Sequence, residues 1–298
     1  MVKVQSVCNG AATIITGFAC GKGAAFGINL ENKVSVELTD DGITSGIKGL
    51  EGKEAPLMNY CVEEVLKATG LESGARVWAE PNMPLGVGLK SSSIAANATV
   101  LATIEALARR EDVDWRAEGL NGVKFGDIDI INLGINAAFR AKVTSTGALD
   151  DASASYFGGY AVTDNLGRKI HARGTIDDHK ILIYLPKNHK EVSSGGVDML
   201  ELKKHEKEVE GYWQKALKGE IFEALTLNGL LHSRIFGYGL EETQAALDAG
   251  AIASGLTGTG PAVVAVVDEI DDVCDVWRPF GGKIIEAKTN NLKARILK

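Results

Sequence analysis

The stretch Pro84-Leu85-Gly86-Val87-Gly88-Leu89-Lys90-Ser91-Ser92-Ser93 lies between a predicted strand and a long apolar segment that opens at Ser91. Glycines let backbone N–H groups approach a phosphate closely, and a helix N-terminus adds partial positive charge and unpaired donors. The serine hydroxyls could donate to phosphate oxygens or bind Mg²⁺. The stretch therefore predicts an anion-binding loop at the start of a helix.

Two better-known phosphate loops are excluded by their spacing. The P-loop pattern GxxxxGK[ST] requires a glycine five residues after Gly86, and the dinucleotide fingerprint GxGxxG requires its third glycine at the same place. Ser91 stands there instead, which disfavours an NAD(P) enzyme. The plain alternative to a phosphate site is a helix entry whose serines serve only as N-caps.

The elements around this loop indicate an α+β protein. Ser91–Arg109 is apolar nearly all round, as expected of a buried helix. Pro56–Thr69 has apolar residues at helical spacing and ends at a glycine. Strands are predicted at Val2–Cys8, Lys33–Leu38 and Ala75–Glu80. The order strand, strand, helix, strand, helix suits helices packed on a mixed or antiparallel sheet, not a doubly wound one.

The second half of the chain has a different texture. Lys187–Gly196 is a polar loop, and the segment after it has Leu202, Val209, Trp213 and Leu217 on one side, as in an amphipathic helix. Late strands are predicted at Ile181–Leu185, Ala262–Val267 and Lys283–Ala287. The domain boundary is placed loosely between residues 160 and 178, and the chain is divided into residues 1–165 and 166–298.

Composition indicates an acidic globular enzyme. Lys and Arg number 32 against 39 Asp and Glu, which gives a formal net charge of −7. A nucleic-acid partner is not expected, because such proteins usually carry a basic excess or stripe. The 35 glycines are about 12% of the 298 residues, against a usual share of about 7%, which is typical of tight turns or of backbone close to a ligand.

The spacing of the cysteines and the absence of a long apolar run predict a cytoplasmic protein. The four cysteines are widely spaced, without a CxxC or Cys/His cluster, which argues against a zinc site and a disulfide scaffold. No run of about 18 apolar residues is present, so no membrane partner is expected. The five histidines have no metal or triad spacing, and no role is assigned to them.

The phosphate-loop stretch resembles the second motif of the GHMP small-molecule kinases, Pro-x-Gly-x-Gly-Leu-x-Ser-Ser-Ser. The longer string from Gly86 to Ala98 is similar to archaeal-type shikimate kinases of that superfamily, as are Gly10–Gly27 and Thr146–Gly159. The resemblance covers essentially the whole chain. It implies a two-domain α+β fold, with an N-terminal domain like ribosomal S5 domain 2 and a ferredoxin-like C-terminal domain.

The resemblance also implies ATP and Mg²⁺ as cofactors. Ser92 is the candidate metal contact, and Lys90, which stands where most of the superfamily has Gly or Ala, is a candidate catalytic cation. The candidate nucleotide-binding residues are Leu85, Gly86, Val87, Gly88, Leu89, Lys90, Ser91, Ser92, Ser93, Ile94 and Ala95.

A second element, Thr146–Ser153 ahead of Gly158-Gly159, resembles the stretch of mevalonate kinases that carries an Asp proposed to orient or deprotonate the substrate hydroxyl. Counting back from Gly158 places that Asp at Asp151, with Asp150 beside it. Phosphoryl transfer depends on positioning, charge neutralisation and alignment of the nucleophile. The alternative is a helix N-cap.

A third element, Ser254–Ala262, resembles the third GHMP motif, a Gly-rich loop near the active centre. Two family features are missing. The first motif often has a Lys where this chain reads Gly10-Ala11-Ala12, so Lys22 or Lys90 is left to supply that charge. The position of the Mg²⁺-binding Glu of mevalonate kinases falls on Arg140, so the metal carboxylate is not identified. Asp150 is one candidate for it, and Arg140 or Lys142 could hold a substrate carboxylate.

The resemblance implies a kinase that converts shikimate to shikimate 3-phosphate in aromatic amino-acid synthesis. Two alternatives stay open from the sequence. One keeps the fold and phosphorylates another small metabolite such as homoserine, mevalonate or a sugar. The other is a non-catalytic sensor that binds nucleotide and metabolite. The oligomeric state does not follow from the sequence.

Overall fold

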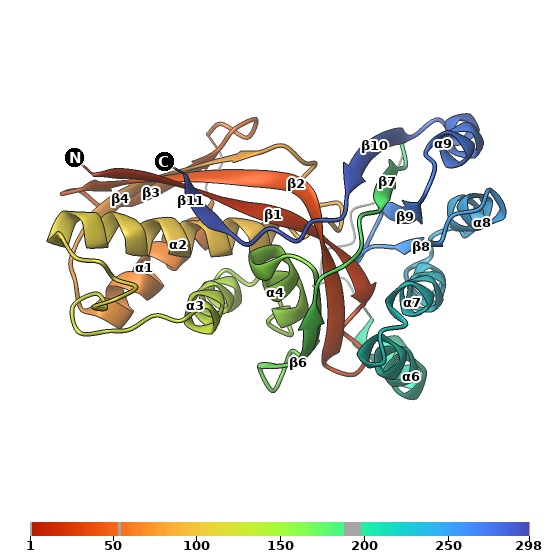
Figure 1. The fold of residues 1–298 in the computed structure, drawn as a ribbon, viewed down its shortest axis with the longest axis horizontal. Coiled ribbons are helices and arrows are strands. Elements are labelled where there is room, and N and C mark those ends of the chain that lie inside the picture. The colour runs from red at the N-terminus through yellow and green to blue at the C-terminus, as the bar shows by residue number, and fades with distance from the viewer. Residues whose placement is uncertain (1, 53–54, 188–197, 298) are drawn as a thin grey trace.

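Two β-sheets organise the computed structural model, which describes residues 2–52, 55–187 and 198–297 (Figure 1). The first sheet has seven strands, in the order β11-β1-β2-β4-β3, with β5 paired to β2 and β6 to β5. Its strands are β1 Lys3–Ile15, β2 Lys22–Thr39, β3 Ile43–Ile47, β4 Gly74–Pro81, β5 Tyr160–Asp164, β6 Lys169–Gly174 and β11 Arg295–Leu297. Its helices are α1 Pro56–Thr69, α2 Ser91–Glu111, α3 Asp127–Arg140 and α4 Leu149–Phe157.

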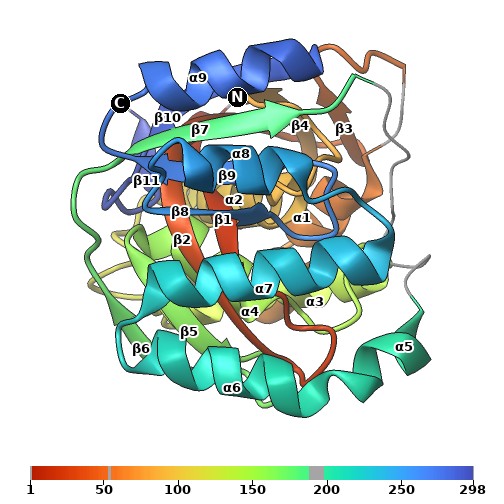
Figure 2. The same cartoon turned by 90° about the vertical axis from the view of Figure 1, so that its right-hand side faces the viewer.

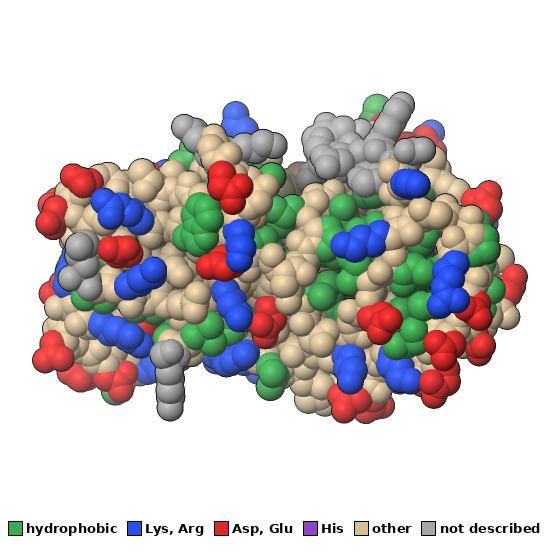
Figure 3. All heavy atoms as spheres, turned by 90° about the horizontal axis from the view of Figure 1, so that it is seen from above, with side chains coloured by type: hydrophobic (Ala, Val, Ile, Leu, Met, Phe, Trp, Pro, Cys, Tyr) green, Lys and Arg blue, Asp and Glu red, His purple; other side chains and the backbone are tan. Residues whose placement is uncertain are grey.

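Helix α2 is the core element of the first sheet's covered face, where it packs on β1 and β2 (Figure 1). Alanines along it are buried, and their small side chains allow close packing on the strands. The helix is buried as the sequence predicted. Helix α1 has the predicted bounds and is followed by Gly70 as its C-cap. Gly70 has a φ of 68°, and its N–H donates to the Leu66 carbonyl. The opposite face of the sheet is open to solvent and carries basic and acidic side chains (Figure 3). Lys33 on β2 and Arg76 on β4 are exposed.

Strands β1 and β2 are much longer than the predicted Val2–Cys8 and Lys33–Leu38, and this is a correction. They pair antiparallel from Lys3 opposite Glu37 to Ile15 opposite Ala24. Their inner halves are buried on both faces, so the alternation that marks a half-exposed strand is lost there. The short strand β3, parallel to β4, was also not predicted, because five half-exposed residues give little signal.

The second sheet has the order β10-β7-β9-β8 with all neighbours antiparallel. In chain order this is 4-1-3-2, the arrangement expected of the ferredoxin-like domain. Its strands are β7 Lys180–Leu185, β8 Ala253–Leu256, β9 Val263–Val267 and β10 Lys283–Lys288. Its helices are α5 Met199–Lys204, α6 Glu206–Leu217, α7 Ile221–Phe236, α8 Glu241–Asp248 and α9 Asp271–Trp277 (Figure 2).

The late elements confirm the three predicted strands to within about a residue and divide the predicted amphipathic segment into α5 and α6, which bury Leu202, Val209 and Trp213. Helices α8 and α9 pack Ala246 and Trp277 against the second sheet. The predicted polar loop Lys187–Gly196 lies, beyond its first residue, outside the described residues. No helix in the described ranges is long and apolar enough to cross a membrane.

The strand pairing changes sheet later than residue 165. Strand β6 still belongs to the first sheet, and the second begins with β7 at Lys180. At the C-terminus the chain returns, because β11 pairs with β1 and places both termini at one end of the first sheet (Figure 1). The division at residues 165 and 166 stays a prediction about folding units.

A pair of helical glycines tests the packing of α7 on β8. A Cβ added at Gly229 would lie 2.5 Å from the Gly255 Cα, whereas one added at Gly211 on α6 would meet nothing within 4 Å. We expect Gly229→Ala to lower the free energy of unfolding by about 1–3 kcal/mol through overpacking. Gly211→Ala should raise it by about 0.5–1 kcal/mol, since Gly is costly in a helix. Urea unfolding of both variants measures the difference, and equal effects would contradict the close approach.

Candidate active site

The phosphate-loop stretch follows β4 and leads into α2, with a backbone that requires glycine. Gly86 and Gly88 have φ of 72° and 89°. A Cβ at Gly88 would lie 2.1 Å from the Thr257 carbonyl oxygen, so the loop can follow this path only where no side chain is present. The first helical hydrogen bond of α2 runs from the Ile94 N–H to the Lys90 carbonyl. The N–H groups of the three serines precede that bond and belong to the open first turn.

The third glycine-rich segment packs directly on this loop. The Thr257 hydroxyl donates to the Gly88 carbonyl at 3.1 Å and accepts from the Thr13 N–H at 3.0 Å. The Gly258 N–H donates to the Thr13 hydroxyl at 2.9 Å. Thus β1, the phosphate loop and the segment after β8 meet at one point. Sequence reasoning did not find Thr13, since a lone threonine in a strand carries no local signal.

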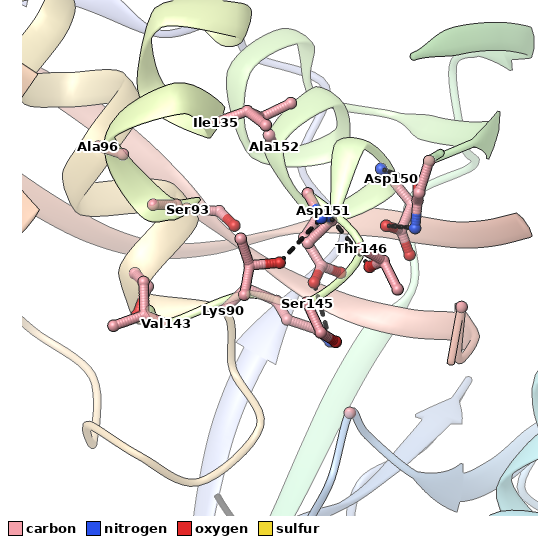
Figure 4. Close-up of a pocket in the computed structure, with 18 of the residues that line it drawn as sticks. Lys90, Ser93, Ala96, Ile135, Val143, Ser145, Thr146, Asp150, Asp151 and Ala152 are labelled. Atoms are coloured by element: carbon pink, nitrogen blue, oxygen red, sulfur yellow. Dashed lines mark hydrogen bonds and ion pairs between the residues drawn. The ribbon is translucent and has the colours of Figure 1, made fainter. Parts of the chain in front are cut away.

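A cavity of about 510 Å³ opens where these segments meet the first turns of α2 and α4 (Figure 4). Its walls also include α3 and the loop 142–148. Of the predicted nucleotide-binding residues, six line this cavity: Gly86, Gly88, Lys90, Ser91, Ser92 and Ser93. The other five are not among its lining residues: Leu85, Val87, Leu89, Ile94 and Ala95. Val87, Leu89 and Ile94 are buried in the hydrophobic core and anchor the loop.

Lys90 and Asp151 lie next to each other in the wall of the cavity (Figure 4). The Lys90 Nζ lies 3.1 Å from the Asp151 Oδ2, and both side chains are nearly buried, at 12% and 11% exposure. The other carboxylate oxygen of Asp151 has no hydrogen-bond partner within the described residues. Burial raises the pKa of Asp151, while the Lys90 ammonium acts in the opposite direction.

Lys90 holds this position at a conformational cost. It is the N-cap of α2 and has φ 65°, in the left-handed region that non-glycine residues rarely adopt. Such strain persists only where the surrounding structure enforces it, and it is concentrated at functional sites.

Asp150 lies beside Asp151 in the first turn of α4 and is 3% exposed. Its carboxylate accepts a hydrogen bond from the Asn165 side-chain amide at 2.8 Å. Burial, followed by the charge of Asp151, raises the pKa of Asp150 to about 7. Asp150 and Asp151 are the carboxylates among the described residues that line the cavity, and those residues contain no group of three or more His, Cys, Asp or Glu arranged for a metal.

The structure distinguishes between the cations that the sequence left open. Lys22 forms an ion pair with Glu210 and lies over the Trp213 ring, outside the cavity. Arg140 bonds to Glu64 at 2.8 Å and also to Glu63, so two carboxylates already hold it, and it does not line the cavity.

Lys142 and Lys90 are the remaining candidates. Lys142 lines the cavity and is exposed, on the loop that also carries Ser145 and Thr146. Lys90 lies next to the aspartates, and Lys142 stays a candidate for an anionic group of a ligand.

The chain is similar to known proteins over nearly its whole length. A family model described as the GHMP kinases N terminal domain matches residues 56–159, which contain the phosphate loop and both aspartates. A shikimate kinase of Methanothermobacter thermautotrophicus is 36% identical, over 97% of this chain and 96% of its own length. A shikimate kinase of Methanothrix thermoacetophila is 39% identical, over 96% and 94%.

Solved structures share the fold at low sequence identity. The Methanococcus jannaschii mevalonate kinase has a TM-score of 0.71 at 14% identity, over 96% of this chain and 98% of that chain. A homoserine kinase from Cytophaga hutchinsonii has a TM-score of 0.69 at 16% identity, over 100% and 98%. These likenesses confirm the predicted two-domain α+β fold.

Two glycines with positive φ test the contact between the phosphate loop and Thr257. A Cβ at Gly88 would collide with backbone, whereas one at Gly122, φ 79°, would meet nothing within 4 Å. Both alanine variants carry the strain of the left-handed region, about 1 kcal/mol or more. We expect Gly88→Ala alone to weaken ATP binding by at least about tenfold, measured by calorimetry on folded protein. Equal affinities for ATP in the two variants would show that the collision does not shape the loop.

Proposed function

Because the chain belongs to the archaeal shikimate kinase family within the GHMP kinases, we propose that it transfers the γ-phosphoryl group of ATP to the 3-hydroxyl of shikimate, forming shikimate 3-phosphate. The observation that carries the proposal is the Lys90–Asp151 pair, 3.1 Å apart beside the phosphate loop. It combines a carboxylate for the attacking hydroxyl with a cation for the transferred phosphoryl group in one cavity.

The nucleotide phosphates would lie on the glycine turn and the first turn of α2. The N–H groups and hydroxyls of Ser91, Ser92 and Ser93 supply donors there, and the helix N-terminus favours negative charge. This assignment is supported by the cavity lining and by the positive φ of Gly86 and Gly88.

A magnesium ion fits the same wall. Mg²⁺ in kinase sites usually takes one or two carboxylates together with substrate phosphates. Asp150 offers a carboxylate and Ser92 adds a hydroxyl from α2. When bound, the ion would neutralise phosphate charge. Asp150 and Ser92 are the proposed holders of the metal.

Asp151 is the proposed proton acceptor in the transfer step. Its unpartnered oxygen would orient the acceptor hydroxyl and take its proton as the hydroxyl oxygen forms a bond to the γ-phosphorus and the bond to ADP breaks. A carboxylate whose pKa is raised by burial is a better base than one in water. Lys90, whose side chain is nearly buried, would stabilise the charge that develops on the transferred group.

The two alternatives are less well supported. Homoserine and mevalonate kinases share the fold at 14–16% identity, whereas the relatives at 36–39% identity over nearly the whole chain are shikimate kinases. A non-catalytic sensor would not need a strained lysine paired with a buried aspartate. The proposed setting is the cytoplasm, where the four unpaired cysteines would stay reduced.

An acceptor panel tests the proposed function. ADP release with ATP and Mg²⁺ is measured for shikimate, homoserine, mevalonate and galactose, with heat-denatured protein as the blank. We expect turnover with shikimate alone, and phosphorus NMR of the product should identify a 3-phosphate ester. Turnover restricted to another acceptor would identify that acceptor as the substrate in place of shikimate. ATP binding without any turnover would favour the sensor.

The ion pair is tested by changing each partner separately. We expect Asp151→Asn to lower kcat by about 10²–10⁴-fold, since general-base contributions have that size, while ATP affinity changes little. Lys90→Met should lower kcat by about 10²–10³-fold through lost charge stabilisation. Both kcat values are measured by steady-state kinetics under the conditions of the acceptor panel.

A matched control exists on α9, whose first turn also carries two neighbouring aspartates, Asp271 and Asp272, both exposed. Asp272→Asn should leave kcat within about twofold. Wild-type kcat in Asp151→Asn would remove Asp151 from the proposed step, and wild-type kinetics in Lys90→Met would do the same for Lys90.

A further inference from the structure

A buried amide on α7 holds the residue that follows β1 by two hydrogen bonds. Helix α7 packs against β1, whose last residue is Ile15 (Figure 2). The Asn228 side-chain oxygen accepts from the Thr16 N–H at 3.1 Å, and its side-chain nitrogen donates to the Thr16 hydroxyl at 3.3 Å. Asn228 is fully buried and Thr16 is 4% exposed. A helix of the second sheet therefore holds both the backbone and the side chain of Thr16.

The partners of this amide determine which way its two ends face. A backbone N–H can only donate, so the atom that faces the Thr16 N–H must be the Asn228 oxygen. The NH₂ group then faces the Thr16 hydroxyl, whose oxygen accepts from it. The hydroxyl hydrogen must point elsewhere, and no described residue accepts it. The amide therefore leaves Thr16 with a free donor.

The residue with this free donor lines the cavity on the side of the aspartates. Thr16 and the next two residues, Gly17 and Phe18, are among the lining residues. A Cβ at Gly17 would lie 2.7 Å from the Asn165 side-chain nitrogen, and that nitrogen donates to the Asp150 carboxylate at 2.8 Å. The turn after β1 is thus packed against the residues of the wall that would receive the acceptor hydroxyl.

We propose that Asn228 is a positioning residue that directs the Thr16 hydroxyl toward the carboxylate of the phosphoryl acceptor. The inference rests on the proposed function, since shikimate supplies that carboxylate. The hydroxyl groups of shikimate both donate and accept, whereas its carboxylate can only accept. A hydroxyl that is held as a donor is therefore complementary to the carboxylate. A hydrogen bond to an ionised group is also about twice as strong as one between neutral groups.

Thr16 differs from Lys142, the exposed cation that the cavity offers to an anionic ligand. A flexible, exposed ammonium attracts an anion as a point charge and does not set its position. The Thr16 hydroxyl is buried, and a buried amide leaves it with the role of donor. Lys142 would thus contribute attraction, and Thr16 would orient the carboxylate so that the ring presents its reacting hydroxyl to Asp151.

The first test removes the hydroxyl and keeps the shape of the side chain. In Thr16→Val we expect KM for shikimate to rise at least about tenfold, the size of a hydrogen bond to a charged group. KM for ATP and kcat should stay within about threefold of wild type, because the nucleotide and the reacting atoms keep their contacts. Thr16→Ser keeps the hydroxyl and should return most of the loss. Circular dichroism and thermal unfolding establish that each variant is folded.

Thr243→Val is the matched control for this change. Thr243 is a buried threonine of α8 that does not line the cavity. Its replacement should leave KM for shikimate at the wild-type value.

The second test turns the hydroxyl around without removing it. In Asn228→Asp the new carboxylate still accepts from the Thr16 N–H but has no donor, so the Thr16 hydroxyl donates to it instead of to the substrate. We expect the same rise in KM for shikimate as in Thr16→Val, and little further change when both are combined. Asn290→Asp is the control, since Asn290 is buried and bonds to both backbone groups of Leu292 outside the cavity. If Asn228→Asp does not fold, the two Thr16 variants decide.

A shikimate analogue with a hydroxymethyl group in place of the carboxylate tests the ligand atom. The ratio of kcat/KM for shikimate to kcat/KM for the analogue should be at least about tenfold smaller in Thr16→Val than in wild type, because the lost bond is made only to the carboxylate. An unchanged ratio overturns the assignment to the carboxylate.

Other outcomes also overturn the proposal. One is a wild-type KM for shikimate in folded Thr16→Val. Another is a rise in KM for ATP instead, which assigns the hydroxyl to the nucleotide. A loss of kcat with both KM values unchanged indicates a merely structural role for the contact.

Failure of the proposed function gives a different result, which appears in the wild type. If the wild type uses homoserine or mevalonate, each of which has a carboxylate, the choice of shikimate is overturned and the Thr16 variants are compared with that acceptor. Turnover of galactose alone, which has no carboxylate, overturns both proposals. Without any turnover, calorimetry compares shikimate binding to wild type and Thr16→Val, and equal affinities overturn the role of Thr16.

Discussion

The ion pair between Lys90 and Asp151 holds the N-termini of two helices together at one cavity. The arrangement of the site depends on this contact. Helices α2 and α4 both begin there, each with an N-cap residue at positive φ. The Lys90 ammonium and the buried aspartates of α4 offset each other's charge before any ligand binds. Breaking a buried pair leaves an uncompensated charge. The unpaired N–H groups at the two helix N-termini favour an incoming anion such as a polyphosphate.

The sequence predicted those parts of the molecule that are encoded locally. Helix α1 is bounded by a proline and a left-handed glycine, and α2 by an apolar run of helical length, so both were found close to their true ends. The backbone of Pro84–Ser93 was predicted because glycine spacing reports a backbone requirement directly, which the positive φ of Gly88 bears out. Its binding of phosphate stays a prediction. The fold class followed from the order of elements and the family resemblance.

The rest depends on contacts between residues far apart in the chain. Thr13 meets Thr257 across 244 positions, and no local pattern marks either one. Asn165 is one polar residue in a turn, where asparagine is common for reasons of backbone conformation alone. The choice between Lys22 and Lys90 also needed the structure, because it depends on Glu210, a residue of α6 that pairs with Lys22. The predicted lengths of β1 and β2 were wrong, because parts of both strands are buried on both faces and show no alternation of apolar and polar residues.

The missing lysine of the first GHMP motif has a structural explanation in β1. Its counterpart, Gly10-Ala11-Ala12, lies inside the strand, and Ala12 is a fully buried member of the hydrophobic core. A Cβ at Gly10 would already lie 2.9 Å from the Ile28 side chain. A lysine there would bury an unpaired ammonium at high cost. The cation must therefore come from another element, and Lys90 lines the cavity from the start of α2 with a left-handed backbone. In chains that resemble this one, a lysine at that strained position and a small apolar residue in β1 should therefore occur together.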